Sequence, residues 1–250
     1  MKLLILAHAP DRGAQAVANL LAASLGPRLM VLPPEWLGQA QWSQRLDGRG
    51  HASTGLRLPF AHAGGSPLAS AQIAFVWNRI RLLPQAAFRA SSARDQEYAG
   101  AELHALVGSW LAELGGRVEP PMRRHASVTP LLHRVHWAAV ASRCGLALVS
   151  GPAAMETFSV LRTPLELCGP AAGALPASAA RACHKVAAEL GFALLSLGFC
   201  GMPAAPRLCR VDAHPGLFSP GEAHAVARWL SHCVDSAPGP SMSNTTELLA

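Results

Sequence analysis

Two polar residues near the C-terminus have the types and spacing of a small metal site. Asp212 and His214 lie at the end of the predicted hairpin strand 207–212, and their side chains share one face if that strand continues. A carboxylate beside an imidazole can bind a divalent metal, and the imidazole favours softer metals than magnesium. Pro215 opposes a continued strand, so a turn-forming role for Asp212 stays equally open.

Two further candidates follow predicted strands. His8 comes after the apolar run 3–7, and Arg79 comes after the run 73–77. Ligands of doubly wound sheets bind at the carboxyl ends of the strands, and an arginine there can hold a carboxylate or phosphate through two hydrogen bonds. The alternatives are a loop histidine close to a helix capped by Asp11, and an arginine that leaves the sheet for solvent.

Two pairs in the middle of the chain complete the candidates. Arg123 and Arg124 precede a predicted helix and can meet an anion, or they form a solvated surface pair. His133 and His136 lie three residues apart on that helix, where they can bind a metal or orient a carboxylate, or occupy its polar face. The predicted substrate-binding residues are therefore His8, Arg79, Arg123, Arg124, His133 and His136, and the predicted metal ligands are Asp212 and His214.

The elements that must position these residues begin with a βαβ unit. A buried strand over 3–7 is followed by a helix that ends at Gly26-Pro27 and by a second strand over 29–32. Residues 73–77 predict the third strand. The segment 38–72 is rich in Gly, Ser, Gln and His without periodicity, and it predicts a long loop. We therefore expect an α/β fold that opens with a parallel sheet and flanking helices.

The rest of the chain predicts more helices and a smaller α+β lobe. Capping residues, glycine stops and turn residues mark its elements. The expected elements are a helix over 94–114, a brief strand over 117–121, a helix from Thr129-Pro130 to Cys144, a strand over 158–161, a helix over 178–190, a hairpin of 192–200 with 207–212, and a helix from the Ser219/Glu222 capping box to about 234.

The composition narrows the classes of protein. Half of the 250 residues are hydrophobic and 14% are charged, so the chain can bury a full core. The net charge is +6 and 19 of the 21 basic residues are arginine, but they form no concentrated run, which argues against nucleic-acid binding. The longest apolar stretches, 137–149 and 186–200, are interrupted by charges and are shorter than the roughly 18 residues of a membrane span.

The six cysteines all lie in the second half of the chain and form no C-x-x-C pair. This spacing excludes a zinc ribbon and favours a reduced, cytoplasmic protein. Cys200 and Cys209 lie on opposite arms of the predicted hairpin, and we expect both to be small buried hydrophobes. The sequence also has no glycine-rich phosphate loop and no G-x-S-x-G nucleophile elbow.

The order of these pieces resembles the ATP-grasp ligases, in particular the glutathione-synthetase-like branch that modifies ribosomal peptides. The resemblance is carried by Trp-Asn-Arg (77–79), Pro-Pro (120–121), Cys-Gly-Leu (144–146), Leu-Leu-Ser-Leu-Gly-Phe (194–199) and Val-Asp-Ala-His-Pro (211–215). It implies a preceding α/β domain, a lysine-bearing domain that clamps ATP, and carboxylates that hold magnesium. The implied reaction activates a carboxylate as an acyl phosphate, which an amine then attacks.

This sequence departs from the family at the residues that do the chemistry. The segment between Val149 and Ser178 is too short for the ATP clamp and contains no lysine, and Lys185 falls on a predicted helix. The position of one metal-binding aspartate is Gly198. The family's Glu-x-Asn is here Asp212-Ala213-His214, which keeps one carboxylate. Because these residues are missing, we expect that the protein neither binds magnesium–ATP tightly nor turns over ATP.

We therefore expect a pre-ATP-grasp-like domain over 1–120, a reduced ATP-grasp-like lobe over 121–235 and a flexible tail over 236–250. The leading hypothesis is a degenerate protein that binds a substrate, a peptide or a partner in a peptide or small-molecule modification pathway. Its expected partners are a second copy or a companion subunit, because a lost lobe exposes surface. No cofactor is expected. The alternatives are a metal-dependent enzyme at Asp212 and His214, and an ATP-dependent carboxylate–amine ligase.

Overall fold

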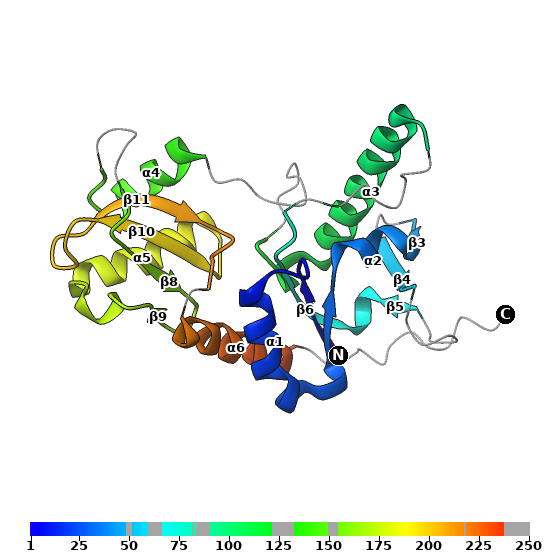
Figure 1. The fold of residues 1–250 in the computed structure, drawn as a ribbon, viewed down its shortest axis with the longest axis horizontal. Helices are drawn as coiled ribbons and strands as arrows, with labels where there is room; N and C mark the ends of the chain where they lie inside the picture. The colour runs from blue at the N-terminus through cyan, green and yellow to red at the C-terminus, as the bar shows by residue number, and fades with distance from the viewer. Residues whose placement is uncertain are drawn as a thin grey trace.

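The computed structural model describes residues 1–48, 52–59, 67–81, 83, 91–121, 133–149, 155–217 and 219–237. Two lobes lie side by side, with the helix α6 (Pro220–Asp235) running beneath both of them (Figure 1). In the described residues, no helix is both long enough and apolar enough to cross a bilayer. The predicted α/β fold, with a parallel sheet in one lobe and a smaller α+β lobe, is confirmed.

The first lobe is built on a parallel sheet of four strands in the order β2-β1-β6-β7. Leu3 and Ile5 of the central strand β1 face one core cluster, and Leu4 and Leu6 face another. Both faces are covered by helices, as a parallel sheet requires. The elements are β1 (Lys2–Leu6), α1 (Arg12–Leu25), β2 (Leu29–Leu32), β6 (Ile73–Asn78), α3 (Ala93–Leu114) and β7 (Val118–Glu119).

The prediction of a long loop over 38–72 is wrong. After the short helix α2 (Pro34–Gln39), the strands β3 (Gln41–Leu46), β4 (Ala52–Arg57) and β5 (Leu68–Ala69) form an antiparallel sheet. One face of this sheet packs on α3, where the rings of Trp42 and Trp110 meet edge to face at 5.5 Å. The sequence does not indicate these strands by apolar alternation, because most side chains of β3 are exposed and polar.

The second lobe contains an antiparallel sheet in the order β11-β10-β8-β9, with α4 and α5 packed against it in one core cluster. The predicted hairpin is present as β10 and β11, and the predicted strand near 158 is present as β8. The elements are α4 (Arg134–Arg143), β8 (Phe158–Arg162), β9 (Leu167–Cys168), α5 (Ala177–Leu190), β10 (Leu195–Cys200) and β11 (Arg207–Asp212).

Two predicted helix starts have different outcomes. Thr129 and Pro130 lie outside the described residues, but α4 begins later than predicted, with His133 at its N-cap. The last helix, α6, begins as predicted: Ser219 accepts a hydrogen bond from the amide of Glu222, and the Glu222 carboxylate accepts one from the amide of Ser219.

The helix α6 connects the second lobe back to the first. It packs against α1, against β1 and β6 of the parallel sheet, and against β9 of the second lobe. Phe75 of β6 and Trp229 of α6 meet edge to face at 5.3 Å. The division into domains at residues 120 and 235 stays a prediction.

Candidate functional site

The residues that could do chemistry converge on a pocket between the lobes. Its volume is about 680 Å³. The first lobe contributes side chains that follow β1 and β6, and the second contributes the end of β11 and the turn after it. The lining residues are His8, Pro10, Asp11, Arg79, Arg81, Arg210, Asp212, His214 and Gly216. The pocket thus lies at the carboxyl ends of parallel strands, where doubly wound sheets bind ligands.

Arg79 and Asp11 form a largely buried ion pair on the first-lobe side of this pocket. The Arg79 Nε donates to Asp11 Oδ2 at 2.7 Å, and its Nη2 donates to Oδ1 at 3.2 Å. Burial alone would raise the pKa of Asp11, but the hydrogen bond and charge of Arg79 outweigh it and lower the pKa below its ordinary value. Asp11 also caps α1 by accepting from the amide of Ala14.

Arg79 and Arg81 of the first lobe donate hydrogen bonds to the backbone of the second lobe. Arg79 Nη1 donates to the carbonyl oxygen of Pro215 at 2.9 Å, and Arg81 Nη2 donates to the carbonyl oxygen of His214 at 3.2 Å. Two arginines that follow one strand of the first lobe therefore hold the turn that carries the candidate metal ligands. Arg79 lies over the ring of Trp77, with 4.8 Å from its Cζ to the ring centroid, which further fixes its side chain.

Asp212 already has partners on both oxygens. Its Oδ1 accepts from the amide of His214 at 2.8 Å, so the turn-forming role left open by the sequence is present. Its Oδ2 lies 3.8 Å from Arg81 Nη2. The carboxylate remains at the pocket wall, but a positive charge faces it.

His214 is a buried, neutral imidazole. Its residue is 6% exposed. Burial, with the nearby charge of Arg81, lowers the pKa of His214 to about 4, so the ring is uncharged at neutral pH. Its Nε2 is buried and makes no hydrogen bond within the described part of the chain. A buried ring nitrogen of this kind suits a bound metal or a hydrogen-bonding group of a ligand.

A third ion pair occupies the space next to Gly198, the position at which the resemblance implies a metal-binding aspartate. A Cβ built on Gly198 would lie 2.3 Å from Oε2 of Glu156 and 3.2 Å from the Cβ of Arg210. Arg210 Nε lies 2.8 Å from the same Glu156 oxygen, and Arg210 Nη2 donates to the other oxygen, Oε1, at 3.5 Å. The carboxylate of Glu156 therefore enters this space from a distant segment, and it is paired with an arginine.

The donor set does not fit a magnesium–ATP site. Magnesium requires hard oxygen ligands in octahedral geometry. The pocket offers Asp212, whose oxygens face an amide and a guanidinium, and His214, a nitrogen donor. Within the described residues, no group of three or more His, Cys, Asp or Glu side chains could hold a metal ion. The pocket wall instead carries three arginines, and each of them is paired with a carboxylate: Arg79 with Asp11, Arg81 with Asp212 and Arg210 with Glu156.

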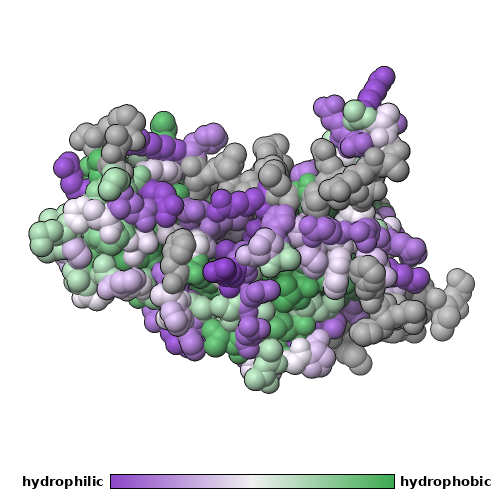
Figure 2. Space-filling view, viewed as in Figure 1, coloured by the Kyte–Doolittle hydropathy of each residue, from purple (hydrophilic) through white to green (hydrophobic). Residues whose placement is uncertain are grey.

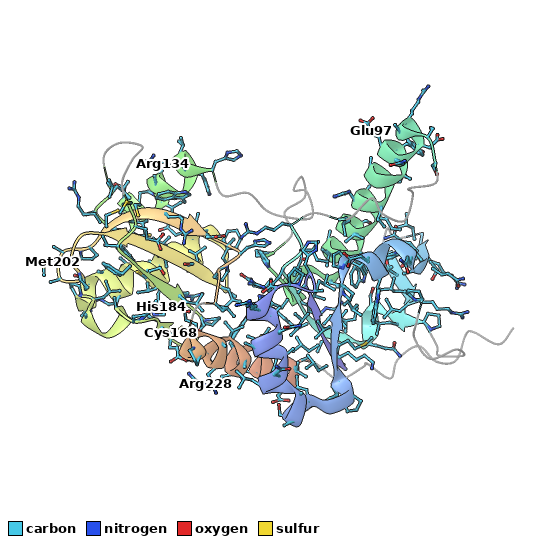
Figure 3. The ribbon with its side chains drawn as sticks, in the orientation of Figure 1. Glu97, Arg134, Cys168, His184, Met202 and Arg228 are labelled. Carbon is cyan, nitrogen blue, oxygen red and sulfur yellow. The ribbon has the colours of Figure 1, made fainter. Side chains whose placement is uncertain are left out.

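The structure brings together four of the predicted site residues: His8, Arg79, Asp212 and His214 all line the pocket. His133 and His136 are exposed on α4 and are not among the lining residues. Figure 3 labels Arg134, the neighbour of His133, on α4 at the upper edge of the second lobe. Arg123 and Arg124 lie outside the described residues.

Sequence reasoning missed the residues whose role depends on contact between distant segments. The sequence predicts Asp11 as a helix cap but does not indicate that it pairs with Arg79. Arg81, two residues after Arg79, has a weak signal because alternate residues of an extended segment share a side. Arg210 and Glu156 have none, since their pairing depends on the segment before β8 lying beside β10, which separates it from β11.

Comparisons with known proteins give matches at the level of structure. No family model matches the sequence, and no curated protein does. A Chryseobacterium gregarium ATP-grasp ligase associated with RiPPs (ribosomally synthesised, post-translationally modified peptides), in complex with ADP and a leader and core peptide, is 11% identical, with 96% of this chain and 98% of that chain covered and a TM-score of 0.68.

Two further solved structures are similar over nearly their whole length. The macrocyclase MdnC from Microcystis aeruginosa MRC, bound with its precursor peptide MdnA, is 12% identical, with 93% and 100% of the two chains covered and a TM-score of 0.66. The ATP-grasp ligase PsnB, complexed with a minimal precursor, Mg and ADP, is 13% identical, with 93% and 98% covered and a TM-score of 0.62. This chain therefore has the fold of the ATP-grasp ligases that modify peptides, as the sequence predicted.

Proposed function

We propose that this protein binds a carboxylate-bearing peptide in the pocket between its lobes and serves as a binding component of a peptide modification pathway, without ATP-dependent ligase activity of its own. The observation that carries the proposal is the set of arginines at the pocket wall: Arg81 and Arg210 pair with the carboxylates that a magnesium site would need unpaired. The similar structures support the class of ligand, because MdnC and PsnB are bound with precursor peptides.

The arginines suit a carboxylate ligand. Arg210 is about half exposed at the pocket wall, and its guanidinium has five N–H donors. Glu156 accepts one hydrogen bond from Nη2 at 3.5 Å and lies 2.8 Å from Nε. Arg81 adds a second positive charge beside Asp212. Guanidinium groups bind carboxylates through paired hydrogen bonds, so an acidic side chain or a C-terminus of a peptide matches this wall.

The same geometry disfavours the ligase alternative. Gly198 supplies no carboxylate, and Asp212 is opposed by Arg81. Lys185 lies on α5 and does not line the pocket. A lysine or arginine that neutralises phosphate charge and a metal held by carboxylates are both needed for phosphoryl transfer. We therefore propose that magnesium–ATP binds no more tightly than about 1 mM.

A specific observation favours a second candidate, a metal-dependent activity at His214 and Asp212. The Nε2 of His214 is buried without a partner in the described residues, and the neutral ring can act as a metal ligand. A transition metal would need further ligands from a substrate or from water. Zinc or nickel bound stoichiometrically, and lost in His214→Ala, would support this candidate over the peptide-binding one.

Association with a second protein forms part of the proposal. A groove of about 550 Å³ runs along α1 and α6, with Leu20, Leu21, Leu165 and Ala227 among its lining residues. Leu165 is 53% exposed. Figure 2 shows apolar residues gathered in the region that α1 and α6 occupy in Figure 1. We propose that a second copy or a companion subunit covers this groove in the cytoplasm, a location consistent with six free cysteines.

Calorimetry with two matched peptides tests the function. The probes are a hexapeptide with two glutamates, the same peptide with glutamines, and magnesium–ATP. We expect the acidic peptide alone to bind, and Arg210→Gln to weaken it about tenfold, as loss of a charge-assisted hydrogen bond would. Arg181→Gln, on the exposed side of α5, is the matched control. Equal binding of both peptides, or micromolar affinity for magnesium–ATP, would contradict the proposal.

A further inference from the structure

We propose that Cys200 and Cys209 form a reversible disulfide across the β10–β11 hairpin, and that this modification changes the pocket through the segment that carries Glu156. The disulfide itself is independent of the proposed function. Its effect on ligand binding rests on that function, and the two parts are tested separately.

The hairpin brings the two thiols into contact through an irregularity in its ladder. Phe199 pairs with Leu208 and Gly198 pairs with Arg210, so Cys209 is an extra residue on β11. The Cys209 thiol lies close enough to the Cys200 thiol for the two to interact. Both cysteines are partly exposed, which corrects the prediction that they are buried hydrophobes.

The protonation of Cys209 sets the order of the reaction. Burial, together with the neighbouring Cys200 thiol, raises the pKa of Cys209 to about 12, so this thiol stays protonated at neutral pH. Cys209 is therefore assigned the second attack and Cys200 the first. Its thiolate displaces one thiol from a small-molecule disulfide such as oxidised glutathione and forms a mixed disulfide. Cys209 then loses its proton and displaces the second thiol, so one small disulfide is reduced to two thiols while one protein disulfide forms.

Oxidation would remove two hydrogen bonds that position the neighbouring segment. The Cys200 thiol donates to the carbonyl oxygen of Met155 at 3.0 Å, and the Cys209 thiol donates to that of Gly198 at 3.3 Å. A disulfide sulfur has no proton to donate. Met155 would lose this contact, whereas Thr157 keeps its bond from its amide to the carbonyl oxygen of Phe199 at 2.8 Å.

Release of Met155 connects the thiols to the pocket. The next residue, Glu156, holds Arg210 through its carboxylate, and Arg210 lines the pocket. When the segment before Thr157 loosens, this exposed ion pair weakens and Arg210 has more donors for an incoming carboxylate. We expect the oxidised protein to bind an acidic peptide about two- to fivefold more tightly, the range set by an exposed ion pair.

Peptide mapping tests the disulfide. The full-length protein is incubated with millimolar oxidised glutathione, its remaining thiols are blocked with N-ethylmaleimide, and it is digested with trypsin. Cleavage after Lys185, Arg207 and Arg210 places Cys200 in peptide 186–207 and Cys209 in the tripeptide 208–210. We expect these two peptides to be joined, and to separate after reduction.

Matched variants make the result specific. Cys200→Ser and Cys209→Ser should each abolish the joined peptide. Cys144→Ser should not, because the Cys144 thiol is hydrogen-bonded to Glu189 on another part of the lobe. Full alkylation of both thiols after oxidation, or glutathione attached to Cys200 without the joined peptide, would contradict the proposed Cys200–Cys209 disulfide.

Calorimetry of the oxidised and reduced protein with the acidic hexapeptide tests the coupling. An affinity that rises on oxidation supports it, provided that Cys209→Ser shows no such rise. If the disulfide forms without changing the affinity for the acidic hexapeptide, the coupling to the pocket is contradicted but the disulfide itself is still supported. If the disulfide forms and the peptide binds in neither state, the proposed function fails and the coupling with it.

Discussion

Two arginine–carboxylate pairs stand on opposite sides of the pocket, and they differ in what surrounds them. Arg79 and Asp11 on the first lobe have side chains 10% and 18% exposed, and Arg79 also binds the backbone of the second lobe. Arg210 and Glu156 on the second lobe have side chains 51% and 29% exposed. The first pair is part of the junction between lobes, and the second covers a space that a glycine leaves open.

We interpret the Arg79–Asp11 side of the pocket as a fixed wall and the Arg210–Glu156 side as an adjustable one. Removing one member of a buried pair leaves an uncompensated charge, which costs far more than the pair itself contributes. Removing one member of an exposed pair lets water and salt replace it. We therefore expect stability to depend on the first pair and ligand binding to depend on the second.

The largest expected effect is from Arg79→Ala. This change leaves the Asp11 carboxylate buried without its partner and removes the hydrogen bond to Pro215, so we expect a loss of about 3 kcal/mol of unfolding free energy. Urea denaturation followed by circular dichroism measures it. Arg81→Ala, nearby but more exposed, serves as the control. A loss below about 1 kcal/mol would show that the Arg79–Asp11 pair is not structural.

A second buried carboxylate at the lobe junction, Glu119, should respond to pH in the opposite sense to Asp11. Glu119 is 3% exposed and accepts from the amide of Leu194 of the second lobe at 2.9 Å. Burial raises the pKa of Glu119 to about 7, although the amides of Leu194 and Ala193 and the charge of Arg162 oppose this.

Because the pKa of Glu119 is higher in the folded state than in the unfolded state, the folded protein binds more protons. Its contribution to stability is present below the unfolded pKa of 4.5 and is lost as pH rises toward about 7. Asp11 behaves oppositely: its lowered pKa contributes stability above 3.8 that is lost as pH falls. We expect Glu119→Gln to remove about 2 kcal/mol of the fall in stability between pH 5 and 7.5. An unchanged pH profile would contradict this assignment.

A smaller effect is expected from Arg210→Gln on stability. The exposed pair with Glu156 should contribute less than about 1 kcal/mol, and 0.5 M salt should abolish the difference from the natural protein by screening. The loss from Arg79→Ala should persist in the same salt. If both variants respond equally to salt, burial does not distinguish the two pairs.

The smallest effect is expected from Gly198→Ala. The new Cβ would lie 2.3 Å from the end of the Glu156 side chain, which can swing away, rather than against rigid backbone. The loss of the exposed pair is offset by the reduced freedom of the unfolded chain, so we expect a net change within about 0.5 kcal/mol. Thermal unfolding measures it. A loss above about 2 kcal/mol would mean that Glu156 is held rigidly and that this wall is not adjustable.

Local patterns predicted the elements whose side chains alternate between core and solvent or are wholly buried. The strands over 3–7 and 73–77 lie in the parallel sheet, and the hairpin of β10 and β11 lies in the second lobe. The strand β3 was missed because it is stabilised by pairing with β4 and by Trp42, not by an apolar pattern of its own. Its formation depends on α3, which lies far along the chain.

The sequence by itself determined which residue types are available for chemistry and that His8 and Arg79 follow buried strands. These are local properties, set by composition and by periodicity within a few residues. Only the tertiary structure decided their partners. The Arg79–Pro215 bond joins residues 136 apart in the chain, and the Arg210–Glu156 bond joins residues 54 apart. The first contact follows from how the two lobes pack, and the second from the strand order within the second lobe, because a side chain's partner is set by the surfaces that meet and not by its neighbours in sequence.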